Sequence, residues 1–485
     1  MRRTRARATR AARSALGLRT TGTVHTKRTA RTVRTARGRL AVVAAAALAA
    51  AMGLPAMPAA AHDSHEPLLS AMRAEAGTAV GGDGIPGVIA RVYKDGVSWT
   101  GTGATDAGTP VRNPDSPFRA GSITKTLTAT AVLQLVAEGR VRLDDDVFGL
   151  LGPVLKTNPV AGCNTSTGQC FNPPPGSPPI TVRNLLQHSS GIFNYLGDLG
   201  VLASAGSSFP NLPEYSAQQL VDEGASHGPQ FAPGGGMHYS NTNYALLGMV
   251  IERVTGHSWA DEVTRRIIQP LGLTHTVLPG STPTLPTPHD QFFTNYLQRR
   301  GLFGHLSVPA ADWNPSIGGA AGAVVSTSGD LITFIRALVG GQLLPPAQLT
   351  QMMTDLNPTG AGAPATQLPG VPCDPTRSWP ECIVNPAIST VSSGDKATPG
   401  YWYASRPWKA VQADYGLGLT RRTVTCANGS TVVLYGHNGA GFGSMSYLYS
   451  TADGSHAIVL NMNGDWPLWE LYSLNGMLAA EFCTA

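Results

Sequence analysis

The order of strand-like and helix-like patterns most limits the fold of this 485-residue chain. Two short apolar runs at residues 87–93 and 98–103 predict strands on either side of the Lys94-Asp95-Gly96 turn. Strand patterns return only at the end of the chain, with Asn428-Gly429 and Asp453-Gly454 as hairpin turns, at residues 415–425, 431–435, 443–450 and 456–462. We therefore expect one antiparallel sheet built from both chain ends.

A helical pattern dominates the middle of the chain, at residues 182–187, 217–223, 244–254, 259–268, 328–338 and 346–355. Further helices are expected at about 67–75 and 467–482, where they would back the sheet. The pattern predicts an α/β (α+β) fold in which a sheet region, about 62–143 and 411–485, holds a helical insertion of about 144–357. Residues 358–410 are rich in Pro, Gly, Ser and Thr and predict an extended loop. A functional site would lie in the cleft between the two regions.

The first 61 residues have the layout of a secretory signal peptide. They contain 13 of the 35 Lys and Arg and no acidic residue, and an apolar run at 40–56 precedes the small residues Pro58-Ala59-Ala60-Ala61. We expect cleavage after Ala61 and a secreted or cell-wall protein without a membrane anchor; a membrane helix at 40–56 is the alternative. The remaining 62–485 carries 22 basic and 30 acidic residues, which argues against nucleic-acid binding.

Six cysteines agree with an extracellular location. Cys163 and Cys170, and likewise Cys373 and Cys382, are close enough in sequence to close local loops, which leaves Cys426 and Cys483 as a long-range pair. Because six cysteines allow 15 connectivities, this pairing is the simplest choice among several. No C-x-x-C is present and the histidines are scattered, so we expect no metal site.

The segment Phe118-Arg119-Ala120-Gly121-Ser122-Ile123-Thr124-Lys125 predicts a nucleophile. Ser122 and Lys125 are three residues apart at the start of an apolar helix, so the amine can reach the hydroxyl. Burial would lower the pKa of the lysine and allow it to accept a proton. Free N–H groups and the positive end of the helix dipole would lie near Ser122.

Two other short motifs compete with this pair. Ser393-Gly394-Asp395-Lys396 has the same spacing but lies among Ser, Gly, Pro and Thr, where no helix would hold the two side chains together. Gly224-Ala225-Ser226-His227-Gly228 matches a nucleophile elbow, but a helix precedes it where such an elbow needs a strand.

Two further motifs support Ser122. Tyr239 and Asn241 lie on a loop just before a helix, where the phenol could serve as a general base and the amide could hold the lysine and a substrate carbonyl. The second motif is Tyr435-Gly436-His437-Asn438-Gly439-Ala440-Gly441 at the end of a strand, whose small residues would let a substrate lie along the strand edge. Taken singly, they are equally compatible with a glycine-rich turn and a hairpin.

The order S-x-x-K, Y-S-N and H-x-G resembles the serine β-lactamase and D-alanyl-D-alanine carboxypeptidase family, in its class C-like branch. The resemblance extends from about Pro67 to Cys483, and secreted DD-carboxypeptidases with cysteines matching Cys426 and Cys483 are similar. It implies a β-lactamase/transpeptidase-like fold, no cofactor, and an acyl-enzyme on Ser122 with Lys125 and Tyr239 moving protons. It also implies an oxyanion site at the N–H groups of Ser122 and Ala440, beside Gly439, with His437 keeping positive potential near Tyr239.

The resemblance implies a D-alanyl-D-alanine carboxypeptidase that acts on peptidoglycan stem peptides and is inhibited covalently by β-lactams; we separately expect a monomer. Two positions depart from the carboxypeptidase pattern: Asn438 replaces Thr and Thr420 replaces Arg, both expected to face the substrate carboxylate. Arg421 is one residue further along the strand, which predicts that it faces the other way. An esterase, a D-amino-acid amidase, a β-lactamase or another enzyme for small acyl substrates therefore stays open, as does a penicillin-binding sensor without turnover.

Overall fold

The computed structural model describes residues 65–77, 87–104, 112–152, 176–197, 209–227, 229–294, 308–354, 413–464 and 470–483. All of these belong to one compact unit, Asp63–Ala485. The expected signal peptide at 1–61, the expected loop at 358–410 and four cysteines lie outside the described residues, the cysteines being Cys163, Cys170, Cys373 and Cys382.

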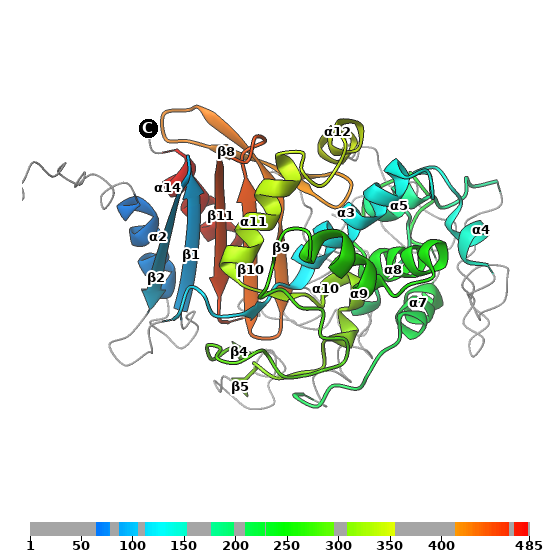
Figure 1. Cartoon of the computed structure of the whole chain (residues 1–485), viewed down its shortest axis with the longest axis horizontal. Coiled ribbons are helices and arrows are strands. Elements are labelled where there is room, and N and C mark those ends of the chain that lie inside the picture. The colour runs from blue at the N-terminus through cyan, green and yellow to red at the C-terminus, as the bar shows by residue number, and fades with distance from the viewer. Residues whose placement is uncertain are drawn as a thin grey trace, which may run out of the picture. The chain divides into compact units, whose positions relative to one another are not determined.

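Strands from both ends of the chain form one seven-stranded antiparallel sheet, as predicted (Figure 1). Its order is β2-β1-β11-β10-β9-β8-β7, so β1, near the start of the chain, pairs directly with the last strand, β11, and β2 pairs with β1 at the edge. The register of β1 on β11 runs from Val88 opposite Met462 to Lys94 opposite His456. The strands are β1 Gly87–Lys94, β2 Val97–Ala104, β7 Ala413–Tyr415, β8 Thr420–Thr425, β9 Thr431–Gly441, β10 Ser444–Ser450 and β11 His456–Met462.

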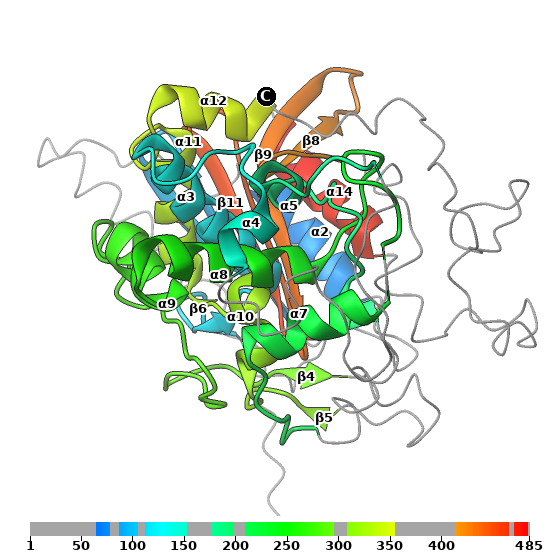
Figure 2. The same cartoon turned by 90° about the vertical axis from the view of Figure 1, so that its right-hand side faces the viewer.

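Helices cover both faces of the sheet, and Figure 2 shows them on its two sides. Helices α2 (Glu66–Gly77) and α14 (Glu470–Phe482) lie on one face, where Leu68, Met72 and Leu474 form a buried cluster with alternate strand residues. Helices α3 (Thr124–Ala137) and α11 (Ser328–Val339) contribute to the larger cluster on the other face. We call this second face the inner face, because the helical region packs against it.

The helical region occupies the middle of the chain, as the sequence predicts. Its helices are α4 Val147–Leu151, α5 Val182–Leu186, α7 Ala217–Ser226, α8 Asn241–Thr255, α9 Trp259–Val263, α10 Gly319–Gly322 and α12 Pro346–Thr354. Short strand pairs join β3 Phe118–Arg119 to β6 Val325–Ser326, and β4 Phe293–Thr294 to β5 Val308–Pro309. Single helical turns lie at Gly121–Ile123, Tyr195–Gly197 and Pro315–Ile317.

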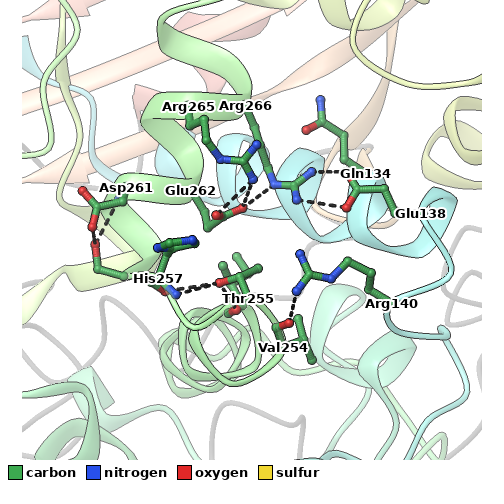
Figure 3. A network of polar contacts seen from close by, with 12 residues as sticks. Gln134, Glu138, Arg140, Val254, Thr255, His257, Asp261, Glu262, Arg265 and Arg266 are labelled. Carbon is green, nitrogen blue, oxygen red and sulfur yellow. Dashed lines mark hydrogen bonds and ion pairs between the residues drawn. The ribbon is translucent and has the colours of Figure 1, made fainter.

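The helix expected at 259–268 changes type halfway. After α9 the chain continues as a π-helical turn, Thr264–Ile268. Two arginines of this turn converge on the buried carboxylate of Glu262, as Figure 3 shows. Arg266 also binds Glu138, just beyond the end of α3. The ion pairs thus fix the end of α3 against the π-helical turn.

Two further segments differ from the sequence prediction. Residues 415–425 form two strands and a turn, because Gly418 adopts φ 79° and the turn inserts Leu417 and Leu419 into the core. A Cβ on Gly418 would lie 2.2 Å from the Cβ of Ala129, so the turn packs directly on α3. Strand β9 is longer than predicted and includes the whole motif around His437.

The chain ends are tied to the sheet as well as packed on it. A disulfide joins Cys426 to Cys483, which confirms the long-range pairing. The buried carboxylate of Glu481 binds two imidazoles: His65 Nδ1 lies 2.9 Å from Oε2, and His456 Nε2 lies 2.8 Å from Oε1. These contacts connect the starts of α2 and β11 to α14.

None of the helices in the described ranges combines the length and the apolar character needed to span a membrane.

Candidate active site

The turn that carries Ser122 connects β3 to α3. Ser122 lies in the 3-10 turn Gly121–Ile123, so the α-helix begins two residues later than the sequence suggests, at Thr124. The hydroxyl of Thr124 donates to the Gly121 carbonyl at 2.6 Å and holds the turn closed. Gly121 has φ 54°, a conformation that costs glycine little. The turn therefore presents Ser122 at the amino end of a buried helical run.

Lys125 is completely buried one turn after Ser122. Its Nζ lies 3.1 Å from Ser122 Oγ, 2.6 Å from Asn241 Oδ1 and 2.7 Å from the Ala321 carbonyl oxygen. Burial lowers the pKa of Lys125 well below its usual value. A neutral amine can donate to the two carbonyl-type oxygens and offer its lone pair to the serine proton. After proton transfer, the ammonium can donate to all three oxygens.

Asn241 is held in one orientation by Asn194. Both the backbone N–H and the side-chain Nδ2 of Asn241 donate to Asn194 Oδ1 at 3.1 Å. The Oδ1 of Asn241 consequently faces Lys125. Because Asn241 is the first residue of α8, the start of that helix fixes its position. The structure thus brings Asn241 together with the Ser122–Lys125 pair.

Tyr239 also reaches this centre. Lys125 Nζ lies 4.8 Å from the centroid of the Tyr239 ring. The same ring packs against His188 at 4.3 Å and against His437 at 6.3 Å. The loop before α8 and the strand β9 therefore meet over the lysine, as the sequence motifs predict.

Two glycines bring β9 against the Ser122 turn. A Cβ added at Gly439 would lie 1.8 Å from the Ala120 carbonyl oxygen and 3.1 Å from the Ser122 nitrogen. A Cβ added at Gly121 would lie 2.6 Å from the Ala440 nitrogen. No larger residue fits at either position, so the backbone groups of Ser122 and Ala440 come close to each other. Paired backbone N–H groups of this kind can bind a developing oxyanion.

His437 is buried and electrically neutral. Its Nδ1 lies 2.5 Å from the Asn438 carbonyl oxygen, so this nitrogen carries the proton and donates it. Its Nε2 accepts from the hydroxyl of Tyr415 at 2.9 Å. Burial, with a further effect of Lys125, lowers the pKa of His437 to about 3. The lowered pKa argues against the expectation that His437 supplies positive potential near Tyr239.

The two residues expected at the substrate carboxylate do not face the site. Asn438 lies opposite Tyr447 on the face covered by α2 and α14, and its Oδ1 accepts from Tyr449 there. Thr420 is fully buried, and its hydroxyl donates to the Gly436 carbonyl at 2.7 Å. Strand alternation explains both positions, because His437 on the inner face requires Asn438 to point the other way.

The same alternation places Arg421 on the inner face. Arg421 pairs with Tyr435, which shares its face with His437 two residues further along β9. The expectation that Arg421 points away from the site is therefore wrong, because the turn at 416–419 resets the strand before residue 420. Arg421 is partly exposed and lies 3.1 Å from Asp414.

Three residues of the centre have roles that the sequence analysis did not recognise. His188 and Tyr415 pack on Tyr239, and Asn194 orients Asn241. His188 and Asn194 lie close together after α5, Tyr415 lies on β7, and no spacing rule connects any of them with Ser122. Within the described residues, no group of three or more His, Cys, Asp or Glu side chains could hold a metal ion.

A serine hydroxyl in contact with a buried lysine, beneath a sheet strand and beside a tyrosine, is the arrangement of a serine hydrolase with a lysine base. Comparisons with known proteins specify the family. The family model described as Beta-lactamase matches residues 72–372, and the chain belongs to this beta-lactamase family of serine hydrolases.

Relatives of several activities resemble the chain. The structure of a D-stereospecific amidohydrolase from Streptomyces sp. is 33% identical with a TM-score of 0.62, and the alignment covers 86% of this chain and 99% of that one. Penicillin-binding protein 4 of Amycolatopsis lactamdurans is 31% identical over 52% of this chain and 59% of its own length. Lovastatin esterase of Penicillium rubens is 29% identical over 50% of this chain and 60% of its own length. The matched region thus spans about three fifths of these two curated relatives.

Proposed function

We propose that the chain is a serine hydrolase that transfers the acyl group of a small amide or ester to Ser122 and then to water. The observation that carries the proposal is the 3.1 Å contact between Ser122 Oγ and the Nζ of the buried Lys125. In the first step the neutral amine takes the hydroxyl proton while Oγ bonds to the substrate carbonyl carbon. The N–H groups of Ser122 and Ala440 would stabilise the resulting oxyanion.

The leaving group needs a proton when the tetrahedral intermediate collapses. Lys125 has just gained one, and the Tyr239 ring lies 4.8 Å from its Nζ. We assign Tyr239 the transfer of this proton to the leaving nitrogen or oxygen. Water then attacks the acyl-enzyme, the same groups remove its proton, and the free acid leaves. Asn241 keeps Lys125 in place and can donate to the substrate from its amide.

The substrate class that we propose is an amide of a D-amino acid. The similarity to the Streptomyces D-stereospecific amidohydrolase supports this substrate class, because the alignment covers nearly all of that chain. The recognition groups support it as well, since His437 is neutral and neither Asn438 nor Thr420 faces the site. Among the described residues of β8 and β9, Arg421 alone offers a cation on the inner face, and Asp414 binds it.

A D-alanyl-D-alanine carboxypeptidase is the second candidate. The position of Arg421 favours it, because a substrate carboxylate could compete with Asp414 for this partly exposed guanidinium. The similarity to Penicillin-binding protein 4 supports the same substrate. We also propose secretion, with residues 1–61 removed; amino-terminal sequencing of the mature protein from the culture medium tests this cleavage.

Two matched substrates separate the candidates: an acylated D-Ala-D-Ala peptide with a free carboxyl terminus, and the same peptide ending in a carboxamide. For the amidase, kcat/KM on the carboxamide equals or exceeds that on the acid. For the carboxypeptidase, the acid is preferred at least about tenfold, as expected for a charge-assisted contact, and Arg421→Gln removes the preference. If the protein formed a penicillin adduct but hydrolysed no amide, ester or thioester, both enzyme proposals would be contradicted. The protein would then be a penicillin-binding sensor.

A further inference from the structure

His188 occupies an unusual place beside the site. It follows α5, is completely buried, and has φ 60°, a left-handed conformation that L-residues rarely adopt. Asp95, in the exposed turn between β1 and β2, is the other described residue besides glycine with a positive φ. A buried residue in this conformation needs a reason in its surroundings.

Two hydrogen bonds to His188 enclose Tyr239. The backbone N–H of His238 donates to the His188 carbonyl at 2.9 Å, and the N–H of Ser240 donates to His188 Nδ1 at 3.1 Å. The imidazole also packs on the Tyr239 ring at 4.3 Å. One residue thus holds the backbone on both sides of Tyr239 and supports its ring.

The protonation of His188 follows from its neighbours. Ser190 Oγ donates to Asn243 Oδ1 at 2.7 Å, so the Nδ2 of Asn243 faces His188 Nδ1, 3.1 Å away. Two donors therefore converge on Nδ1, which must be an unprotonated acceptor. Burial, followed by the nearby Lys125, His437 and His238, lowers the pKa of His188 well below its usual value.

We propose that His188 is a positioning residue: through its carbonyl oxygen and Nδ1 it fixes the His238–Ser240 backbone, so that Tyr239 stays over Lys125 in the geometry that proton transfer needs. The inference rests on the proposed role of Tyr239. His188 itself does not touch the reacting atoms. Its left-handed backbone turns both acceptors toward the same loop.

Two substitutions isolate the Nδ1 acceptor. His188→Gly tolerates the positive φ but has no side-chain acceptor, and leaves the buried Ser240 N–H unpaired. His188→Asn also tolerates this φ, and its Oδ1 can take the place of Nδ1. Acylation by an activated ester is measured by stopped flow, with KM determined separately. We expect His188→Gly to lower the acylation rate by about 10²-fold with KM little changed, and His188→Asn to recover most of the rate.

Asp95→Gly is the matched control for the backbone conformation and should leave acylation unchanged. Hydrogen exchange of the segment containing residues 238–241 gives a second readout, which needs no activity: it accelerates in His188→Gly and stays near wild type in His188→Asn. The proposal is overturned if His188→Gly acylates like wild type, or if His188→Asn loses as much rate and protection as His188→Gly. Absence of acylation in the wild type would instead contradict the proposed function, and the exchange comparison would still decide the role of His188.

Discussion

The hydroxyl of Tyr415 donates to His437 Nε2 at 2.9 Å, while Nδ1 of the same imidazole donates to the Asn438 carbonyl. Both ring nitrogens are therefore used by a neutral histidine. We therefore expect the positive charge beside the nucleophile to come from Lys125 after it has accepted a proton.

We expect His437 to stay neutral throughout pH 5–8, because burial lowers its pKa to about 3. Imidazole ¹⁵N NMR should show a protonated Nδ1 and an accepting Nε2 over this range, with His437→Gln used to assign the signals. Titration of this ring near its ordinary pKa would contradict the account.

Lys125 should give the pH–rate profile its rising limb. Its pKa is lowered by burial, so the amine loses its proton, and kcat/KM rises, at a pH well below 10.5. Arginine cannot lose its proton, and Lys125→Arg should lower acylation by about 10²- to 10⁴-fold and abolish the limb. Lys94→Arg, the same change on the exposed end of β1, is the control. If the rising limb of the pH–rate profile persisted unchanged in Lys125→Arg, the proton transfer would belong to a group other than Lys125.

Lys125 also makes a prediction for stability. Between its lowered native pKa and its unfolded value of 10.5, the unfolded chain binds more protons than the native one. The free energy of unfolding should therefore rise with pH across this interval. Urea titrations at several pH values measure the slope, which Lys125→Met should reduce.

The carboxylate of Glu262 should be important for stability and not for chemistry. Its side chain is 1% exposed, and Arg265 and Arg266 bind it at 2.8 and 2.5 Å (Figure 3). Glu262→Gln leaves these cations without their charge partner, and we expect a loss of about 3 kcal/mol in the free energy of unfolding. Arg73→Ala, in a pair with Glu66 that is 57% exposed on both sides, should change it by less than about 1 kcal/mol.

The pH dependence of this network has a defined sign. Burial opposes ionisation of Glu262, but hydrogen bonds from Arg266 and Arg265 outweigh it and lower the pKa of the carboxyl. Its stabilisation is therefore present above the unfolded pKa of about 4.5 and is lost as the pH falls through the lowered native value. A melting temperature of Glu262→Gln that equals wild type at pH 7 would show that the network contributes nothing.

The Cys426–Cys483 disulfide closes a long loop, with 57 residues of sequence separation. Replacing both cysteines by serine should lower the free energy of unfolding by about 2–4 kcal/mol. The bond lies beside α14, on the face of the sheet away from Ser122, so the acylation rate should stay unchanged. Loss of acylation without loss of stability would contradict this separation.

The sequence predicted those parts of the structure that depend on local pattern. The 3.6-residue period placed Ser122 and Lys125 on one helical turn, and the strand patterns at both ends predicted the antiparallel sheet. The side of the sheet on which a residue lies could not be predicted next to a turn. The four residues at 416–419, for example, decide which way Arg421 points. Long-range partners such as Asn194 and Tyr415 depend on tertiary packing, and the left-handed backbone of His188 has no signal in composition.

Intact-protein mass spectrometry after incubation with a penicillin tests the central claim most directly. The wild-type mature protein should gain the mass of one penicillin, and Ser122→Ala should gain none, because Ser122 Oγ is the atom that forms the acyl bond. Peptide mapping should place the adduct on the segment that contains Ser122. An adduct of the same mass and amount on Ser122→Ala would show that the nucleophile lies elsewhere and would contradict the site described above.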